Sequence, residues 1–146
     1  MSGEFRILSI NISTAKGVQK IPVDRAVLRA GHGIVGDAHA GEWHRQVSLL
    51  ADEDVELMRE RGLEVGPGAF AENLTTSGVE LASLPVGTRL ELGDALLEVT
   101  QIGKECHSRC AIYEQAGDCV MPRRGIFARV IRGGEISRES RCRYGV

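Results

Sequence analysis

Hydrophobic residues alternate with polar ones along several short segments, and this period of two predicts β-strands. In residues 5–12, Leu8, Ile10 and Ile12 fall on one face and Phe5 and Ile7 on the other. We therefore expect a first strand that is buried on both sides. The same pattern predicts further strands at residues 18–21, 24–30, 46–50, 88–92, 95–102 and 126–131.

One segment has the charge order of a helix. Residues 52–61 begin with three acidic side chains, end with Arg59 and Arg61, and are followed by Gly62. Val55 and Met58 give this helix a narrow apolar stripe, so we expect it on the outside of a sheet. A second, shorter helix is predicted at residues 111–116.

The many short strands and few helices favour a mainly β fold. Gly93-Asp94 is a two-residue loop suited to a hairpin between strands 88–92 and 95–102. The chain has 146 residues, 18 of them glycine, and few aromatic residues. We predict a small β-barrel with one or two appended helices, formed by a single domain over residues 1–136. Residues 137–146 are polar and arginine-rich without periodicity, so we expect a mobile tail.

The overall charge excludes some classes of partner. A formal net charge of −2 gives no general attraction to nucleic acid or to anionic membranes, so we expect neither as a partner. The sequence has no apolar run of membrane-spanning length and no signal pattern at its start, which favours the cytoplasm. In that compartment four cysteines favour metal, redox or catalytic roles over disulfides.

The strand at 95–102 leads into a segment rich in reactive side chains. Cys106 and Cys110 have Lys104, His107 and Arg109 as neighbours, and nearby cations lower the pKa of a thiol. We therefore favour a functional role for Cys106 and Cys110, as catalytic thiolates or metal ligands, over simple packing. For Cys119 and Cys142 we favour packing. The C-x₃-C spacing without a second pair argues against zinc.

A long loop over residues 31–45 is the second candidate site. It contains four glycines, three histidines and the only tryptophan of the chain. A single histidine is as well explained by a partly exposed polar role. Together, five residues would form a wall with an aromatic face, charge and hydrogen-bond donors, suited to an anionic heterocycle: Asp37, His39, Trp43, His44 and Arg45.

A pair of arginines, Arg123 and Arg124, forms a third candidate. Guanidinium groups bind phosphate in a forked geometry, although a solvated turn explains the pair equally well. The sequence contains no phosphate-binding glycine motif of the Walker or dinucleotide type, and no serine nucleophile elbow.

These residues resemble the MOSC domain, the family named for the C-terminal domain of molybdenum cofactor sulfurase, in its short, free-standing bacterial form. The resemblance covers most of the chain. It rests on Gly-Ile-Val-Gly-Asp-Ala-His-Ala (33–40), Trp-His-Arg-Gln-Val-Ser-Leu-Leu (43–50), Phe-Ala-Glu-Asn-Leu (70–74), Leu-Pro-Val-Gly-Thr (84–88), Glu-Val-Thr-Gln-Ile-Gly-Lys-Glu-Cys (98–106), Gly-Asp-Cys-Val-Met-Pro-Arg (117–123) and Gly-Ile-Phe-Ala-Arg-Val (125–130).

The resemblance implies a strand-rich barrel that binds the molybdenum cofactor, molybdopterin, or carries sulfur as a cysteine persulfide, independently of pyridoxal phosphate. Cys106 matches members with Pro-Cys after the strand, and Cys110 matches members with Arg-Cys, so both stay candidates. Asp37 and Asn73 match the Gly-Asp and Glu-Asn motifs and are expected at the same pocket. Arg45, Arg123 and Arg124 would bind the pterin phosphate, and Trp43 and His44 the pterin ring.

One departure and several alternatives remain. The residues after Gly133-Gly134 are polar where family members have a hydrophobic strand, so the last barrel strand is expected to be shortened or lost. The alternatives to a cofactor-binding or sulfur-carrying domain are a sulfurase-like transferase, a molybdenum-dependent reductase of N-hydroxylated compounds, and a non-catalytic module that delivers cofactor. A molybdoenzyme or a cysteine desulfurase would be the protein partner.

Overall fold

The computed structural model describes residues 2–16, 18–103 and 124–145. Its elements, in chain order, are β1 (Gly3–Ile12), β2 (Ile21–Val23), β3 (Arg25–Arg29), β4 (Gly33–Ile34), β5 (Val47–Ala51), α1 (Asp52–Glu60), β6 (Leu74–Ser77), the 3₁₀ turn η1 (Leu81–Ser83), β7 (Arg89–Leu92), β8 (Ala95–Ile102), β9 (Ile126–Arg132), β10 (Gly134–Ser137) and β11 (Cys142–Tyr144). The predicted helix at 111–116 lies outside the described residues.

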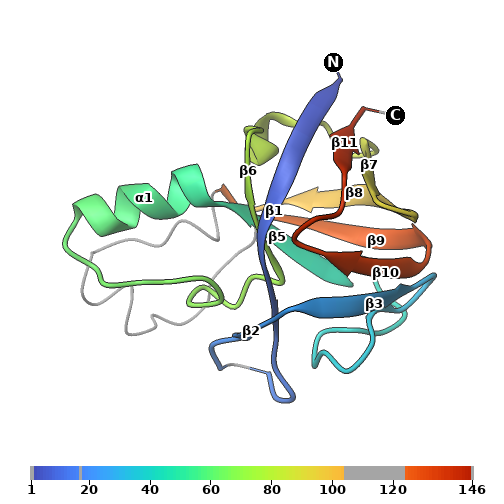
Figure 1. Cartoon of the computed structure of the whole chain (residues 1–146), viewed down its shortest axis with the longest axis horizontal. Helices are drawn as coiled ribbons and strands as arrows, with labels where there is room; N and C mark the ends of the chain where they lie inside the picture. Colours follow the sequence, from blue (N-terminus) through green and yellow to red (C-terminus); the bar gives the residue numbers. More distant parts are fainter. Residues whose placement is uncertain (1, 17, 104–123, 146) are drawn as a thin grey trace.

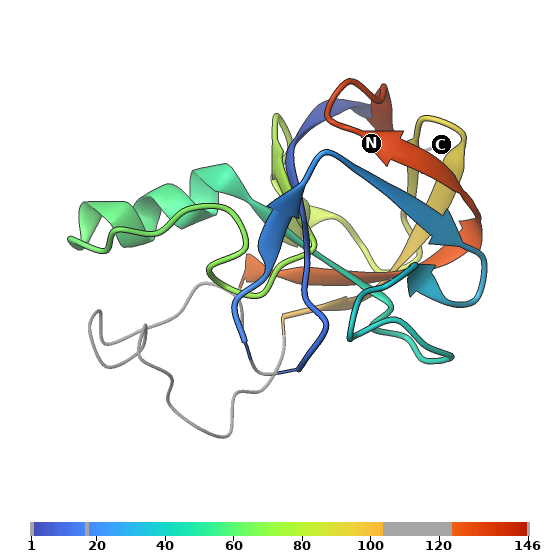
Figure 2. The same ribbon diagram turned by 60° about the horizontal axis from the view of Figure 1, so that its bottom comes forward.

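Seven strands form a closed barrel, which confirms the predicted fold class (Figures 1 and 2). Their order is β11-β7-β8-β9-β5-β6-β1, and the pairing of β11 with β1 closes the ring. β5 and β6 are parallel neighbours, and α1 lies in the connection between them. The predicted hairpin is present, since Leu92 pairs with Ala95 across the Gly93-Asp94 turn. Beside the barrel, β10, β3 and β4 form a small antiparallel sheet.

The barrel interior holds the main hydrophobic core. Leu49, Leu74, Leu90 and Leu97 are fully buried there, together with residues from most of the other strands. The face of β5 that points away from the interior is also covered, because Leu50 packs against Val55 and Met58 of α1 and against two phenylalanines. The predicted helix and its apolar stripe are therefore confirmed, and Figure 1 shows α1 projecting from the side of the barrel.

The first strand differs from the prediction on one point. Phe5, Ile7 and Ile10 are buried, but Leu8 is exposed, so β1 is not covered on both sides. The pairing of β1 with β6 shifts register between Ile7 and Ser9. In a regular strand Leu8 and Ile10 would face the same side. The bulge adds one residue to β1 between them and so turns Ile10 toward the interior.

The end of the chain contains a strand where we predicted a mobile tail. In β11, Cys142 pairs with Phe5 of β1 on one side and with Leu92 of β7 on the other. The barrel is therefore complete. The last strand is short, with three residues, but the expectation that it could be lost is corrected. Cys142 is buried, and burial raises the pKa of its thiol to about 12, which fits the packing role predicted for it. The described part of the chain has no helix with the length and apolarity needed to span a membrane.

Candidate functional site

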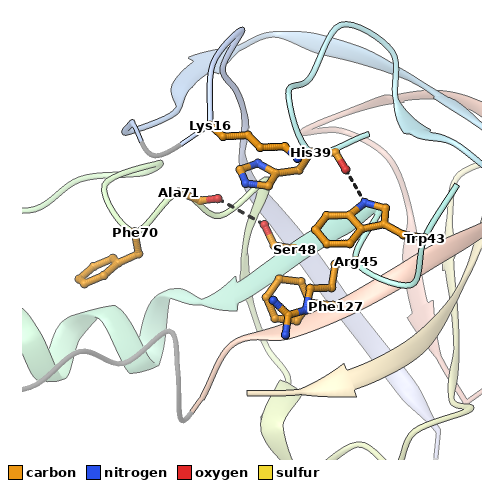
Figure 3. Close-up of a pocket in the computed structure, with 8 residues that line it drawn as sticks. All are labelled: Lys16, His39, Trp43, Arg45, Ser48, Phe70, Ala71 and Phe127. Atoms are coloured by element: carbon orange, nitrogen blue, oxygen red, sulfur yellow. Dashed lines mark hydrogen bonds between the residues drawn. The ribbon is translucent and has the colours of Figure 1, made fainter. Parts of the chain in front are cut away.

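A cavity of about 160 Å³ opens on the outside of the barrel, next to β5 and β9 (Figure 3). The side chains around it are cationic, aromatic or small: Lys16, His39, Trp43, Arg45, Ser48, Phe70, Ala71 and Phe127. Three of the five residues predicted from the loop at 31–45 thus line one cavity. Its volume is below the roughly 300–1,000 Å³ of whole-ligand pockets, so the described walls have room for part of a ligand only.

Two neighbouring strands, β5 and β9, contribute side chains to the floor of the cavity, and β8 lies on the other side of β9. Phe127 of β9 lies opposite Ser48 of β5 and opposite Gln101 of β8. The Arg45 guanidinium lies over the Phe127 ring, with its carbon 5.2 Å from the ring centroid (Figure 3). This cation–π contact holds a positive charge against an apolar surface.

Gln101 fixes the two residues before β5. Its Oε1 accepts hydrogen bonds from His44 Nε2 at 2.8 Å and from Arg45 Nε at 3.1 Å. Its own amide nitrogen donates to the Gly103 carbonyl at 2.7 Å, which assigns the orientation of the amide. His44 is therefore held by Gln101 and, unlike Arg45, is not among the residues around the cavity.

A buried ion pair supports the opposite wall. Lys20 Nζ lies 2.8 Å from Asp37 Oδ1, and both side chains are fully buried. Lys20 also lies 2.9 Å from Nδ1 of His39, the residue that lines the cavity. Burial alone would raise the pKa of the Asp37 carboxyl, but hydrogen bonds from Lys20 and the Ser13 amide, with the Lys20 charge, hold that pKa below its usual value near 3.8. Asp37 therefore stays ionised and supports His39 from behind.

Trp43 forms the outer edge of the cavity. Its indole nitrogen donates to the His39 carbonyl at 2.8 Å, and 38% of the residue is exposed (Figure 3). Lys16 Nζ lies 5.5 Å from the centroid of the Trp43 ring. Two cations, Lys16 and Arg45, thus each lie against an aromatic ring at the cavity, an arrangement that suits an anionic ligand with a flat surface.

Asn73 lies behind the cavity. It is fully buried, and its Oδ1 accepts from the backbone and the hydroxyl of Ser48. Its amide nitrogen donates to the Asn11 carbonyl. Nearby, Ala71 has a φ of 61°, rare for a residue with a side chain, and its carbonyl accepts from Ser48 Oγ. Asn73 therefore holds the strands together beneath the cavity.

Among the remaining predicted residues that the structure describes, Arg124 is not brought to this cavity. Arg124 pairs with Asp54 at 3.0 Å and with Glu80 at 3.2 Å, in a separate open cavity beside α1. Cys106, Cys110 and Arg123 lie outside the described residues. Within the ranges that the structure describes, no group of three or more histidine, cysteine or acidic side chains could hold a metal ion.

Sequence reasoning missed several residues of the site. Lys20 carries no local signal, because its partners lie 17 and 19 positions away. Lys16 lies between the predicted strands at 5–12 and 18–21, where a single lysine gives no signal. Phe127 is part of a predicted strand, and its outward direction could have been inferred from the inward direction of Ala128. Gln101 does belong to a quoted motif, but its role depends on contacts with a distant loop.

Comparison with known proteins identifies related folds. The MOSC domain pattern matches residues 36–142, well over half of the chain. The YuaD protein of Bacillus subtilis is 19% identical, with a TM-score of 0.83 over 99% of this chain and 97% of that one. YiiM of Escherichia coli is 21% identical, with a TM-score of 0.69 over 97% of this chain and 69% of that one. YiiM of Geobacillus stearothermophilus is 21% identical, with a TM-score of 0.70 over 96% of this chain and 74% of that one. A search of the curated proteins found no match.

Proposed function

The chain belongs to the MOSC domain family, and on that premise we propose that it binds a molybdopterin-type cofactor in the cavity beside β5. In this proposal a cysteine of residues 104–123 supplies a thiolate to molybdenum or carries sulfur. The family is generally associated with molybdenum cofactor binding and sulfur-related functions. The cofactor would supply the redox or sulfur-transfer chemistry, while the chain binds and orients it.

The observation that carries the proposal is the pairing of cations with aromatic surfaces. Lys16 lies over Trp43, and Arg45 lies over Phe127. A pterin phosphate combines a dianion with a flat ring system, so it needs both kinds of contact. The cavity of about 160 Å³ would take the anionic group, with the rest of the ligand extending past the exposed Trp43. Lys16 thus takes the place that the sequence analysis gave to Arg124, which is neutralised by two carboxylates.

The position of Gly103 supports a cysteine ligand near this cavity. Gly103 follows β8 directly, and its carbonyl accepts from Gln101, which also holds Arg45. Three peptide units separate Gly103 from Cys106, so covalent geometry limits the distance between their Cα atoms to about 11 Å. The corresponding limit on the distance from Gly103 to Cys110 is larger, so this argument favours Cys106 as the ligand. A thiolate is a suitable soft ligand for molybdenum and a suitable sulfur carrier.

The test is cofactor content after purification from a host that makes molybdenum cofactor. Molybdenum and the fluorescence of oxidised pterin are measured in wild type and in Cys106→Ser, Cys110→Ser and Arg45→Gln. We expect one cysteine variant to lose molybdenum. We expect Arg45→Gln to lower cofactor affinity about tenfold or more, because a hydrogen bond to a charged group contributes about 1.5–3 kcal/mol.

The matched control is Arg25→Gln, which removes an exposed arginine of β3 that pairs with Glu135 of β10. It should retain wild-type cofactor content. A folded wild-type protein without pterin or molybdenum would contradict the proposal, as would equal losses in the Arg45 and Arg25 variants. Molybdenum retained in both cysteine variants would exclude the thiolate ligand.

A further inference from the structure

A fully buried lysine lies behind the cavity, and its three N–H groups have three acceptors. Lys20 Nζ lies 2.8 Å from Asp37 Oδ1, 3.2 Å from Ser13 Oγ and 2.9 Å from His39 Nδ1. An ammonium group has three donors and no acceptor capacity. Each proton of Lys20 thus has one partner, and the third partner is a ring nitrogen of a residue that lines the cavity.

The partners of Lys20 are themselves oriented as acceptors. The Ser13 hydroxyl donates to the Ala15 carbonyl at 3.0 Å, so its lone pairs are available to Lys20. Asp37 Oδ1 accepts from the Ser13 amide as well, and Asp37 Oδ2 accepts from the His39 amide at 3.1 Å. The carboxylate therefore fixes both the lysine and the backbone of His39. A buried pair that is hydrogen-bonded on all sides keeps its geometry.

The contact with Lys20 determines the tautomer of His39. A nitrogen that accepts from an ammonium group must present a lone pair, so Nδ1 carries no proton. In the neutral imidazole the proton then lies on Nε2. We propose that the buried Lys20–Asp37 pair locks His39 in the Nε2–H tautomer and so makes it a fixed hydrogen-bond donor at the cavity.

The lock has a consequence for the chemical class of the ligand. Lys16 and Arg45 are donors only, and the lock gives His39 the same character. The Ser48 hydroxyl is engaged by Asn73 and Ala71. The side chains that the described residues contribute to the cavity therefore suit a group that only accepts hydrogen bonds, such as a fully ionised oxyanion, and disfavour amines. The identification of this oxyanion as a pterin phosphate rests on the proposed function. The proposed tautomer of His39 does not depend on that function.

The test reads the tautomer directly by ¹⁵N NMR of the imidazole nitrogens. Spectra are recorded without ligand at about pH 8, above the usual histidine pKa of about 6.5. Lys20→Met alone leaves a buried carboxylate without its partner, so the informative variant is Lys20→Met with Asp37→Asn, which preserves net charge. We expect a single Nε2–H tautomer in wild type. In the double variant we expect the Nδ1 resonance to move toward the position of a mixture of tautomers.

His44 is the internal control in the same spectra. It is held by Gln101 on the other side of the cavity, so an unchanged His44 signal shows that the double variant is folded. A proton on Nδ1 of His39 in wild type would overturn the proposal. An unchanged His39 spectrum in the folded double variant would overturn it as well.

Ligand class is tested with inorganic phosphate and methylammonium. Phosphate should shift the His39 Nε2 resonance of wild type, and methylammonium should not. The double variant should bind phosphate roughly twofold more weakly, because only about half of its His39 side chains would carry the Nε2 proton. Equal phosphate affinity in both proteins, or binding of methylammonium instead, would overturn the donor role. Failure to find pterin in the purified protein would contradict the proposed function alone.

Discussion

Among single residues, Glu72 is unusual because its carboxyl is fully buried without a cation among its hydrogen-bond partners in the described chain. Its oxygens accept from the Phe70 amide at 3.2 Å and from the Thr75 hydroxyl at 2.7 Å. Burial raises the pKa of Glu72 above its usual value of 4.5, although these hydrogen bonds oppose the rise. Glu72 follows Ala71, which lines the cavity, directly in the chain.

The raised pKa of Glu72 predicts how stability depends on pH. Between pH 4.5 and the higher folded-state pKa, the folded protein keeps a proton that the unfolded chain has released. The free energy of unfolding should therefore fall as pH rises through that window, by about 1.4 kcal/mol for each pH unit that separates the folded-state pKa from the unfolded one. Glu72→Gln cannot titrate, so its stability should not show this fall. Urea unfolding at a series of pH values measures both proteins.

Asp37 provides the control for the Glu72 experiment, because its pKa moves in the opposite direction. Its folded-state pKa is lowered, so its contribution to stability is present above pH 3.8 and is lost as pH falls further. Wild type and Glu72→Gln should share this acid transition. Parallel stability profiles of the two proteins above pH 4.5 would contradict the role assigned to Glu72.

The sequence predicts site residues where a single loop gathers them, and misses those that distant contacts bring in. His39, Trp43 and Arg45 are recognisable because histidines, glycines and the only tryptophan lie together in residues 31–45. Lys20 becomes meaningful only when folding removes it from water and places it between Asp37 and His39. Burial and long-range pairing are properties of the folded chain, and no local pattern encodes them.

At the scale of elements, β11 is decisive because it joins the two edges of the sheet. Arg143 in its centre lies opposite Glu4 of β1 and Glu91 of β7. Its side chain is partly exposed and pairs with Glu91 at 3.1 Å. The polar composition of this strand follows from that exposure, since only Cys142 is buried. Tyr144 is half-buried against the core beside Phe5. A strand of three residues is too short to show alternation, which explains why the sequence predicted a tail.

A proline in β11 should open the barrel. Arg143→Pro removes a backbone donor from a strand that has partners on both sides. We expect a loss of about 1–3 kcal/mol or more in the free energy of unfolding, because a backbone group is left unpaired. Arg143→Thr is the matched control. It removes only an exposed ion pair and should change stability by less than about 1 kcal/mol.

Urea unfolding distinguishes these two variants, and gel filtration reports association through the freed edges of β1 and β7. Equal stability of the proline and threonine variants would contradict the closing role of β11.

The longer strands differ from β11 in how readily the sequence reveals them. β5 and β8 have five or more residues with buried leucines, so their patterns are readable without knowledge of the partners.

At the scale of the whole molecule, the described residues just before and just after the segment with Cys106 and Cys110 lie side by side. Ile102 of β8 lies opposite Ile126 of β9, and the Gly103 amide donates to the Gly125 carbonyl at 2.6 Å. Residues 104–123 therefore leave and re-enter the described structure at adjacent positions. The contacts of Gln101 with His44 and Arg45, and the cavity walls described above, are all formed by residues outside 104–123.

Replacing residues 104–123 by a short Gly-Ser linker should therefore convert β8 and β9 into a simple hairpin and leave the barrel folded. We expect the shortened protein to unfold cooperatively and to keep the fluorescence spectrum of Trp43, the only tryptophan. It should still bind inorganic phosphate, because Lys16, His39 and Arg45 remain, but it should lose molybdenum with Cys106 and Cys110. Molybdenum retained at the wild-type level would show that neither cysteine is the ligand. Loss of cooperative unfolding would show that the barrel depends on the removed residues, whereas loss of phosphate binding in a folded protein would move the anion site away from the described cavity.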